Sequence, residues 1–104
     1  GAPDEDHFGY VFSGYVDVPE QGVWEFMTKS DDGSVLYIDG VKVVNNDGSH
    51  AAVAATGRIA LEKGLHGFEL LYFEDYEGQE LEWGWKKTSD SGFSAIPEDR
   101  LFCR

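Results

Sequence analysis

Hydrophobic side chains recur at every second position through most of this chain. In the segment VWEFMT, Trp24 and Phe26 alternate with Glu25 and Met27, and a similar alternation runs through LEWGWK at residues 81–86. This spacing predicts β-strands, because successive side chains of a strand point to opposite faces. No segment keeps a helical period over several turns.

The segment HGFELLYFE gives the clearest strand. Phe68, Leu70 and Tyr72 fall on one face, and Leu71 and Phe73 fall on the other. Apolar side chains on both faces indicate a strand in the centre of a sheet.

Turn residues separate these segments. Asp39-Gly40 stands between the apolar runs 35–38 and 41–44, which predicts a two-residue β-hairpin loop. Gly14 interrupts the first strand and suggests a bulge or bend there, whereas AAVAATG at residues 51–57 is compatible with either helix or strand. About seven short strands with glycine-rich turns predict an all-β sandwich or barrel.

Length and charge narrow the classes of function. The chain has 104 residues, so we expect residues 1–104 to form one domain, and its abrupt start suggests a piece of a longer protein. The net charge of −12 repels phosphate backbones and anionic membranes, so nucleic acid and membrane insertion are not expected. Cations and neutral polar ligands remain as candidates. Cys103 is the sole cysteine, which excludes an internal disulfide.

The pair Asp31-Asp32 is the first candidate for chemistry. Ser-Asp-Asp-Gly is ordinary turn sequence, because aspartate tolerates turn geometry and bonds its own backbone. Two carboxylates are also hard oxygen ligands of the kind that Ca²⁺ prefers, although the ion needs six to eight oxygens. Other loops would have to supply the remainder, and the EF-hand pattern is not met.

Two further loops carry polar groups. The loop at residues 74–79 offers carboxylates, the aromatic ring of Tyr76 and the amide of Gln79, a mixture that suits sugars. Asn46 and Asp47, in the second loop, could bond a ligand at the rim. Either loop could instead be a simple solvated turn.

We expect no catalysis by this chain. It has no nucleophile motif, phosphate loop or dinucleotide fingerprint, and a carboxylate pair of the glycosidase type means little among so many acids. Its three histidines lack the spacing of zinc ligands. Trp83 and Trp85 share a face, for which core packing is favoured over a sugar platform.

Longer motifs carry a resemblance over nearly the whole chain. FSGYVDVPEQGVWEF, SDDGSVLYIDG, GRIALEKGLHGFELLYFE and IPEDRLF occur in this order. Together they resemble the protective-antigen (PA14) domain family, in the variant attached to bacterial secreted glycoside hydrolases. The resemblance implies an antiparallel β-sandwich, here a short version that lacks part of the N-terminal strand region.

The resemblance also implies a function. PA14 domains are usually non-catalytic modules that bind carbohydrate or pack against neighbouring domains of the parent protein. In lectin-like members, aspartates at the positions of Asp31 and Asp32 bind Ca²⁺, which contacts the sugar. A later loop completes that site, and here this corresponds to Asp75, Glu77 and Gly78.

We therefore expect a possibly Ca²⁺-dependent carbohydrate-binding module of a secreted, periplasmic or cell-surface bacterial protein that processes polysaccharides. One alternative is a structural spacer or packing domain of a glycoside hydrolase with no ligand of its own. Another is a protein-binding module of an adhesin.

Overall fold

The computed structural model describes residues 7–31, 33–46, 53–75 and 80–103, with side chains omitted at 7, 8, 31, 74, 75 and 80. Nine strands and one 3₁₀-helix at Glu98–Arg100 make up this part of the chain. The strands are β1 (His7–Val18), β2 (Gly22–Asp31), β3 (Gly33–Ile38), β4 (Val41–Asn46), β5 (Val53–Leu61), β6 (Gly64–Asp75), β7 (Glu80–Lys87), β8 (Ser94–Ala95) and β9 (Leu101–Cys103).

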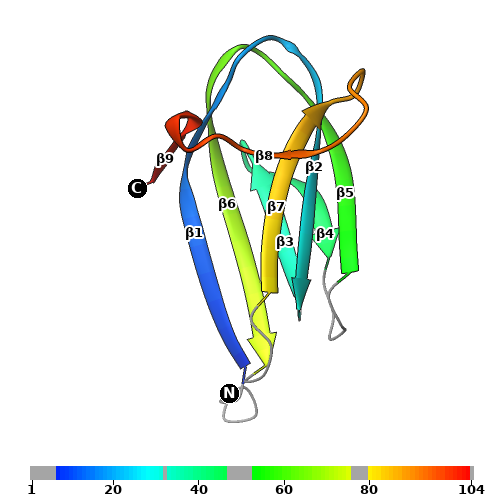
Figure 1. The fold of residues 1–104 in the computed structure, drawn as a ribbon. Coiled ribbons are helices and arrows are strands. Elements are labelled where there is room, and N and C mark those ends of the chain that lie inside the picture. Colours follow the sequence, from blue (N-terminus) through cyan, green and yellow to red (C-terminus); the bar gives the residue numbers. More distant parts are fainter. Residues whose placement is uncertain (1–6, 32, 47–52, 76–79, 104) are drawn as a thin grey trace.

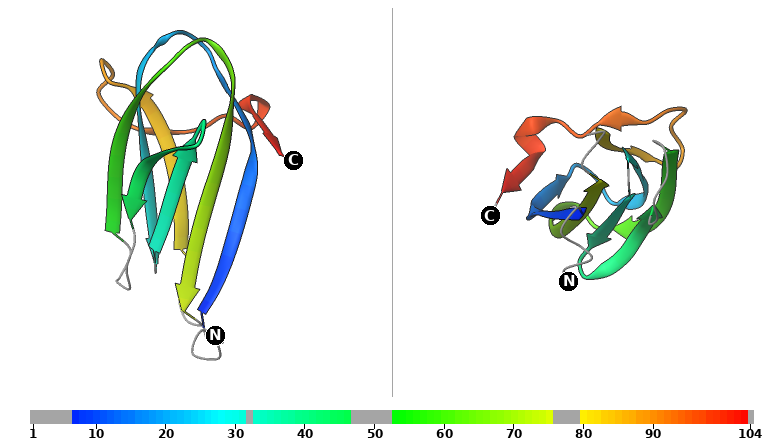
Figure 2. Two further views of the ribbon diagram at one scale, coloured as in Figure 1. Left: turned by 180° about the vertical axis from the view of Figure 1, so that it is seen from behind. Right: turned by 90° about the horizontal axis from the view of Figure 1, so that it is seen from below.

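The strands form two antiparallel sheets that face each other as a sandwich (Figure 1). Sheet A has the order β4-β3-β6-β1-β9, and sheet B has the order β5-β2-β7-β8. The two layers are also visible from below (Figure 2). The predicted all-β antiparallel sandwich is confirmed. No helix in the described residues is long and apolar enough to cross a membrane.

The period-two alternation separates buried from exposed side chains, as predicted. Trp24 and Phe26 of β2 are buried, whereas Glu25 and Met27 are only partly covered. In β6, Phe68, Leu70 and Tyr72 point into the core. The rings of Trp24 and Trp85, from neighbouring strands of sheet B, lie 4.6 Å apart between their centroids. The core therefore consists of the inward positions of both sheets.

β6 lies between β3 and β1, which confirms that it is a central strand. Its second apolar face is not covered by another layer, however. Phe73 is 37% exposed on that face, and Leu65 is 61% exposed. One apolar face of β6 packs against sheet B, and the other is partly exposed, because sheet B covers only one side of sheet A.

Two predictions for single segments are decided by the structure. Gly14 does not mark a bulge, since β1 pairs with β6 in continuous register from His7 to Val18. A Cβ at Gly14 would lie 2.0 Å from the carbonyl oxygen of Phe102, so glycine is needed for the close approach of β9.

The segment at residues 51–57, whose sequence is compatible with either helix or strand, is extended from Val53 onward and forms the first half of β5.

The Asp39-Gly40 hairpin forms as predicted. Both residues have positive φ angles, 52° and 80°, as a tight hairpin with two left-handed residues requires. The hairpin is held by His66, whose Nδ1 lies 2.6 Å from Asp39 Oδ2 and whose Nε2 lies 2.7 Å from the carbonyl oxygen of Glu62. Both ring nitrogens face acceptors, an arrangement that favours the doubly protonated ring.

This environment raises the pKa of His66 above its ordinary value of 6.5. Partial burial of the ring acts to lower the pKa, but the hydrogen bond to Asp39, the bond to the Glu62 carbonyl and the two nearby carboxylates together outweigh it. The imidazole ring therefore binds its proton more tightly in the folded state than in the unfolded state.

We predict that His66 makes folding stability depend on pH. Because the pKa is higher in the folded state, the stabilisation is complete below about pH 6.5 and is lost as pH rises through the folded value. The difference in unfolding free energy between wild type and His66→Gln should be larger at about pH 6 than at about pH 8.5, by less than about 1 kcal/mol because Asp39 is exposed. Urea denaturation at both pH values measures it, and an equal difference at the two would contradict the prediction.

The two sheets touch along the side formed by β4 and β5. A Cβ at Gly57 of β5 would lie 1.7 Å from the carbonyl oxygen of Val43 in β4. That contact is with backbone, which cannot rotate away. Glycine at this position therefore allows the sandwich to close on this side.

We predict that Gly57→Ala destabilises the fold by about 2–3 kcal/mol, since β4 and β5 must separate to admit the methyl group. Gly92→Ala is the matched control: a Cβ at Gly92 meets nothing within 4 Å. The control should change stability by no more than about 0.5 kcal/mol. Equal effects of the two substitutions in chemical denaturation would refute the role of the contact.

Candidate functional site

The strands that precede the candidate loops end at the same end of the sandwich. β2 ends at Asp31, β4 ends at Asn46 and β6 ends at Asp75, at the lower end in Figure 1. We call this the loop end. The strands that follow these loops, β3, β5 and β7, begin there too, so three connections are gathered at one place.

Backbone pairing gives the neighbours at the loop end. Asp31 of β2 is the cross-strand partner of Glu80 in β7, and Gly33 of β3 is the partner of Phe73 in β6. Between Asp31 and Gly33 the chain passes from sheet B to sheet A. The backbone of Asp31 therefore lies at the end of sheet B where the chain passes to sheet A, beside the start of β7.

Most of the predicted ligands fall outside the described residues. These are Asp32, Asp47, Tyr76, Glu77, Gly78 and Gln79. For Asp31 and Asp75 the structure describes the backbone only. Their roles as Ca²⁺ or sugar ligands stay predictions, supported so far by where the strands end.

Asn46 is the predicted ligand whose side chain is described. It is 6% exposed, and its Nδ2 donates to the carbonyl oxygens of Thr28 (3.2 Å) and Val53 (2.6 Å). These bonds tie the end of β4 to β2 and to the start of β5. Asn46 thus supports the loop end from within, and a direct contact with ligand stays a prediction.

A strip of hydroxyl groups replaces apolar side chains in the core near the loop end. Ser34 Oγ lies 2.8 Å from Ser30 Oγ and donates to Thr28 Oγ1 at 2.9 Å. All three residues are fully buried. Buried hydroxyls need partners at fixed positions, so this strip sets the spacing of β2 and β3 close to the end of β2 at Asp31.

These hydroxyl residues are not among the candidates predicted from the sequence. A signal was present, because Thr28 and Ser30 continue the inward positions of Trp24 and Phe26 along β2. Polar residues that occupy inward positions at one end of an apolar strand indicate a polar region of the core. Which hydroxyls meet across the sheets depends on the packing of β2 against β3.

We predict that Asn46→Ala lowers the unfolding free energy by about 1–3 kcal/mol, because the buried carbonyl group of Thr28 and the partly buried carbonyl group of Val53 lose their donor. Asn45→Ala is the matched control, since Asn45 is exposed on the same strand. Urea denaturation compares the two. A loss for Asn46→Ala no greater than for Asn45→Ala would show that the amide does not support the loop end.

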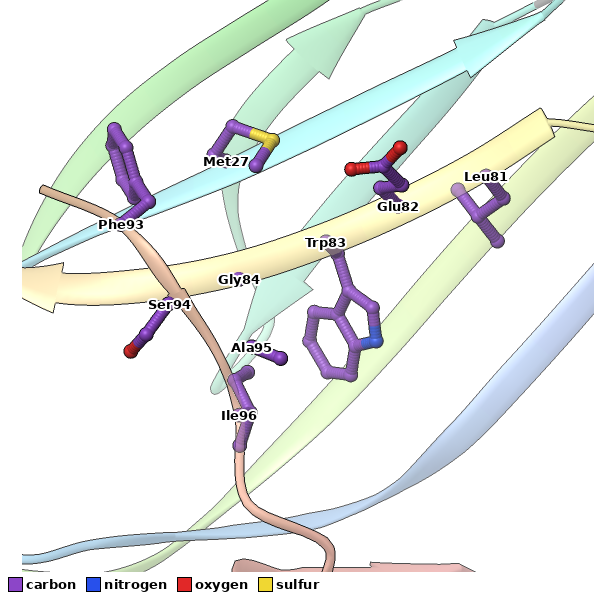
Figure 3. A pocket seen from close by; sticks show the side chains of 9 residues that line it. All are labelled: Met27, Leu81, Glu82, Trp83, Gly84, Phe93, Ser94, Ala95 and Ile96. Carbon is purple, nitrogen blue, oxygen red and sulfur yellow. The ribbon is translucent and has the colours of Figure 1, made fainter.

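The tryptophans pack in the core, as favoured from the sequence. Trp85 is 5% exposed, and the ring of Trp83 lies 5.1 Å from that of Phe68 in the opposite sheet. Trp83 is only half-buried and lines a shallow depression of about 430 Å³ beside β8 (Figure 3). That depression lies along β7 and not at the loop end.

Within the part of the chain that the structure describes, no three His, Cys, Asp or Glu residues gather in a way that could hold a metal ion. Of the three histidines, His66 is engaged with the hairpin.

A sequence profile of the PA14 domain matches residues 2–99. The chain belongs to the PA14 domain family. This confirms the resemblance seen in the motifs, and the sandwich described above is the PA14 fold.

Individual relatives agree with this assignment. A β-hexosaminidase of Porphyromonas gingivalis (strain W83) is 29% identical over an alignment of 97 positions, which covers 86% of this chain and 12% of the relative. The PA14 domain of the antifreeze protein MpAFP superposes with a TM-score of 0.82 at 18% identity, over 91% of this chain and 51% of that one. The PA14 sugar-binding domain of an RTX adhesin gives a TM-score of 0.75 at 19% identity, over 94% and 52%.

The two solved structures share the fold at low identity, so they bear on architecture alone. The PA14 chain spans a small part of the hexosaminidase and about half of each solved structure. Relatives of this module thus occur within longer polypeptides.

Proposed function

We propose that this PA14 domain is a non-catalytic carbohydrate-binding module of a polysaccharide-processing protein, and that Ca²⁺ at the loop end joins protein to glycan. The observation that carries the proposal is the convergence of strand ends at Asp31 and Asp75. Three connections with many oxygen ligands then begin at the same end of the sandwich, and a cation that needs six to eight oxygens could draw on all of them.

Each ligand in this proposal has a stated part. Asp31 and Asp32 bind the ion, and Asp75, Glu77 and Gly78 complete its shell. Tyr76 offers an aromatic face to the sugar ring, while Gln79 and Asp47 bond its hydroxyls. The buried hydroxyl strip and the Asn46 amide support this arrangement by holding the strand ends in place.

Charge and relatives add support. A net charge of −12 attracts cations from a distance. One relative by fold is a sugar-binding domain of an adhesin, and one relative by sequence is a hexosaminidase. A glycan partner and a place outside the cytoplasm fit both of these relatives. Weak Ca²⁺ binding fits such a place too, because extracellular modules bind Ca²⁺ with dissociation constants of about 10⁻⁴–10⁻³ M.

We predict that Ca²⁺ raises the melting temperature and that EGTA reverses the effect. At a Ca²⁺ concentration one hundred times Kd, binding to the native state alone stabilises it by about 2.7 kcal/mol, or roughly 10 °C or more for a domain of this size. Asp31→Asn and Asp32→Asn should each abolish most of the shift. Asp90→Asn, at an exposed carboxylate in the β7–β8 connection, is the control and should retain it.

Glycan binding is tested on an array of polysaccharides with and without Ca²⁺. Binding that requires Ca²⁺ and is lost in Asp32→Asn supports the proposal. A thermal shift without glycan binding would mean that the ion has a structural role. Neither response at millimolar Ca²⁺ would favour the spacer or packing domain.

A further inference from the structure

The sandwich is closed along β4 and β5 but open along the opposite side, between β1 and β7. On that side the chain crosses from β8 in sheet B to β9 in sheet A, near the upper end in Figure 1. Below this crossing, some inward-facing side chains of the described strands stay partly exposed. We call this region the open flank: Tyr10 and Phe12 of β1, and Leu81 and Trp83 of β7, with the buried Leu70 of β6 at its base.

Exposure along β1 shows where the cover ends. Val16 and Val18 point into the core and are 0% exposed. Tyr10 and Phe12 lie on the same face of the same strand, yet they are 44% and 48% exposed. Their cross-strand partners, Tyr72 and Leu70, are buried inward residues of β6, so these two aromatic side chains occupy core positions without a full core around them.

The uncovered region is hollowed. A groove of about 300 Å³ lies between the sheets and is lined by Phe12, Phe68, Leu70, Leu81, Trp83, Leu101 and Cys103. None of these residues is charged. Figure 3 shows Leu81 and Trp83 on the side of β7 that faces β6, with Glu82 on the opposite side.

The edge of β1 beside this groove is also free. In the described structure β9 pairs with β1 only at Gly14–Val16, and no strand pairs with the same edge over His7–Ser13. From Phe8 to Val16 the strand has no charged residue. Free edges are normally protected by charge against pairing with other chains, as Lys42 in β4 and Arg58 in β5 illustrate at the other edges.

We propose that the open flank binds an added β-strand, supplied by a neighbouring region of the same longer polypeptide. The strand pairs with β1 over Gly9–Ser13 and places apolar side chains, two residues apart, into the groove opposite Tyr10 and Phe12. Main-chain hydrogen bonds give the affinity and the groove selects the side chains. This inference does not depend on Ca²⁺ or glycan binding.

Three observations favour this occupant. The added strand extends a pairing that already exists, because β9 lies on the same edge and leads along it toward the loop end. Relatives of the chain carry additional sequence, since it spans 12% of the hexosaminidase and about half of the solved structures. A second copy of the chain is disfavoured by the repulsion between two bodies of net charge −12.

Hydrogen exchange tests the pairing directly, in residues 1–104 alone and in the natural polypeptide that carries them. In the longer protein, the amides of Gly9–Ser13 that face away from β6 should exchange at least about tenfold more slowly. The amides of β4, Val41–Asn46, at the opposite edge of sheet A serve as the internal control and should not change. Equal exchange of Gly9–Ser13 in both proteins would overturn the proposal.

A pair of variants separates the flank from general stability. Phe12→Asp should lower the denaturation midpoint of the longer protein more than that of the 104-residue chain, because only the longer protein covers the side chain. Leu65→Asp, at a 61% exposed position on the outer face of sheet A, is the control and should affect both equally. A concentration-dependent dimer of the 104-residue chain that Phe12→Asp dissociates would instead identify a second copy as the occupant, and would refute the strand.

Discussion

The twelve-residue antiparallel pairing of β1 with β6 is the constraint on which the rest of the structure depends. It fixes which side chains of both strands face sheet B, since a slip of one residue would turn every inward side chain outward. In the upper half of β1 this register buries Val16 and Val18 under the crossing segment. In the lower half it presents Tyr10 and Phe12 to a flank that no described strand covers. The same register thus accounts for both the buried core positions of β1 and the exposed positions at the open flank.

The character of the core changes along the same strands. Trp24 and Phe26 of β2 pack against apolar partners, whereas Thr28 and Ser30, further along, bond to Ser34 across the sheets. Apolar contacts are non-directional and tolerate small shifts, but hydrogen bonds between buried hydroxyls require defined positions. Directional bonds therefore stand behind the loop end, where ligands on three connections would have to keep fixed distances from one ion.

Two surfaces of the module are consequently suited to different partners. The loop end, where three connections with many polar residues begin, is the surface that we propose for an ion and a sugar. The open flank is apolar and has a free strand edge, and we propose it for polypeptide. The two surfaces share β6 and β7 but lie at different places on the sandwich, so a module anchored through its flank would still present its loop end. A role as a packing domain and a role as a glycan-binding module would thus use different surfaces of one fold.

The sequence by itself determined most of the strands, the Asp39-Gly40 hairpin, the family and most inward residues, because these follow from local alternation, turn chemistry and motif order. It predicted about seven strands where the described residues form nine, and it left the first half of β5 open between helix and strand. Only the tertiary structure decided which strands are neighbours, and with that the place of Gly14 against Phe102 and of Gly57 against Val43. From its polar sequence neighbours, Asn46 is predicted to lie at the rim of a ligand site, yet its amide donates to two carbonyl groups of other strands. Such roles depend on contacts between residues far apart in the chain, which local pattern does not encode. The open flank is the clearest case: the alternation places Tyr10 and Phe12 on the core face, but only the position of the second sheet decides that they stay exposed.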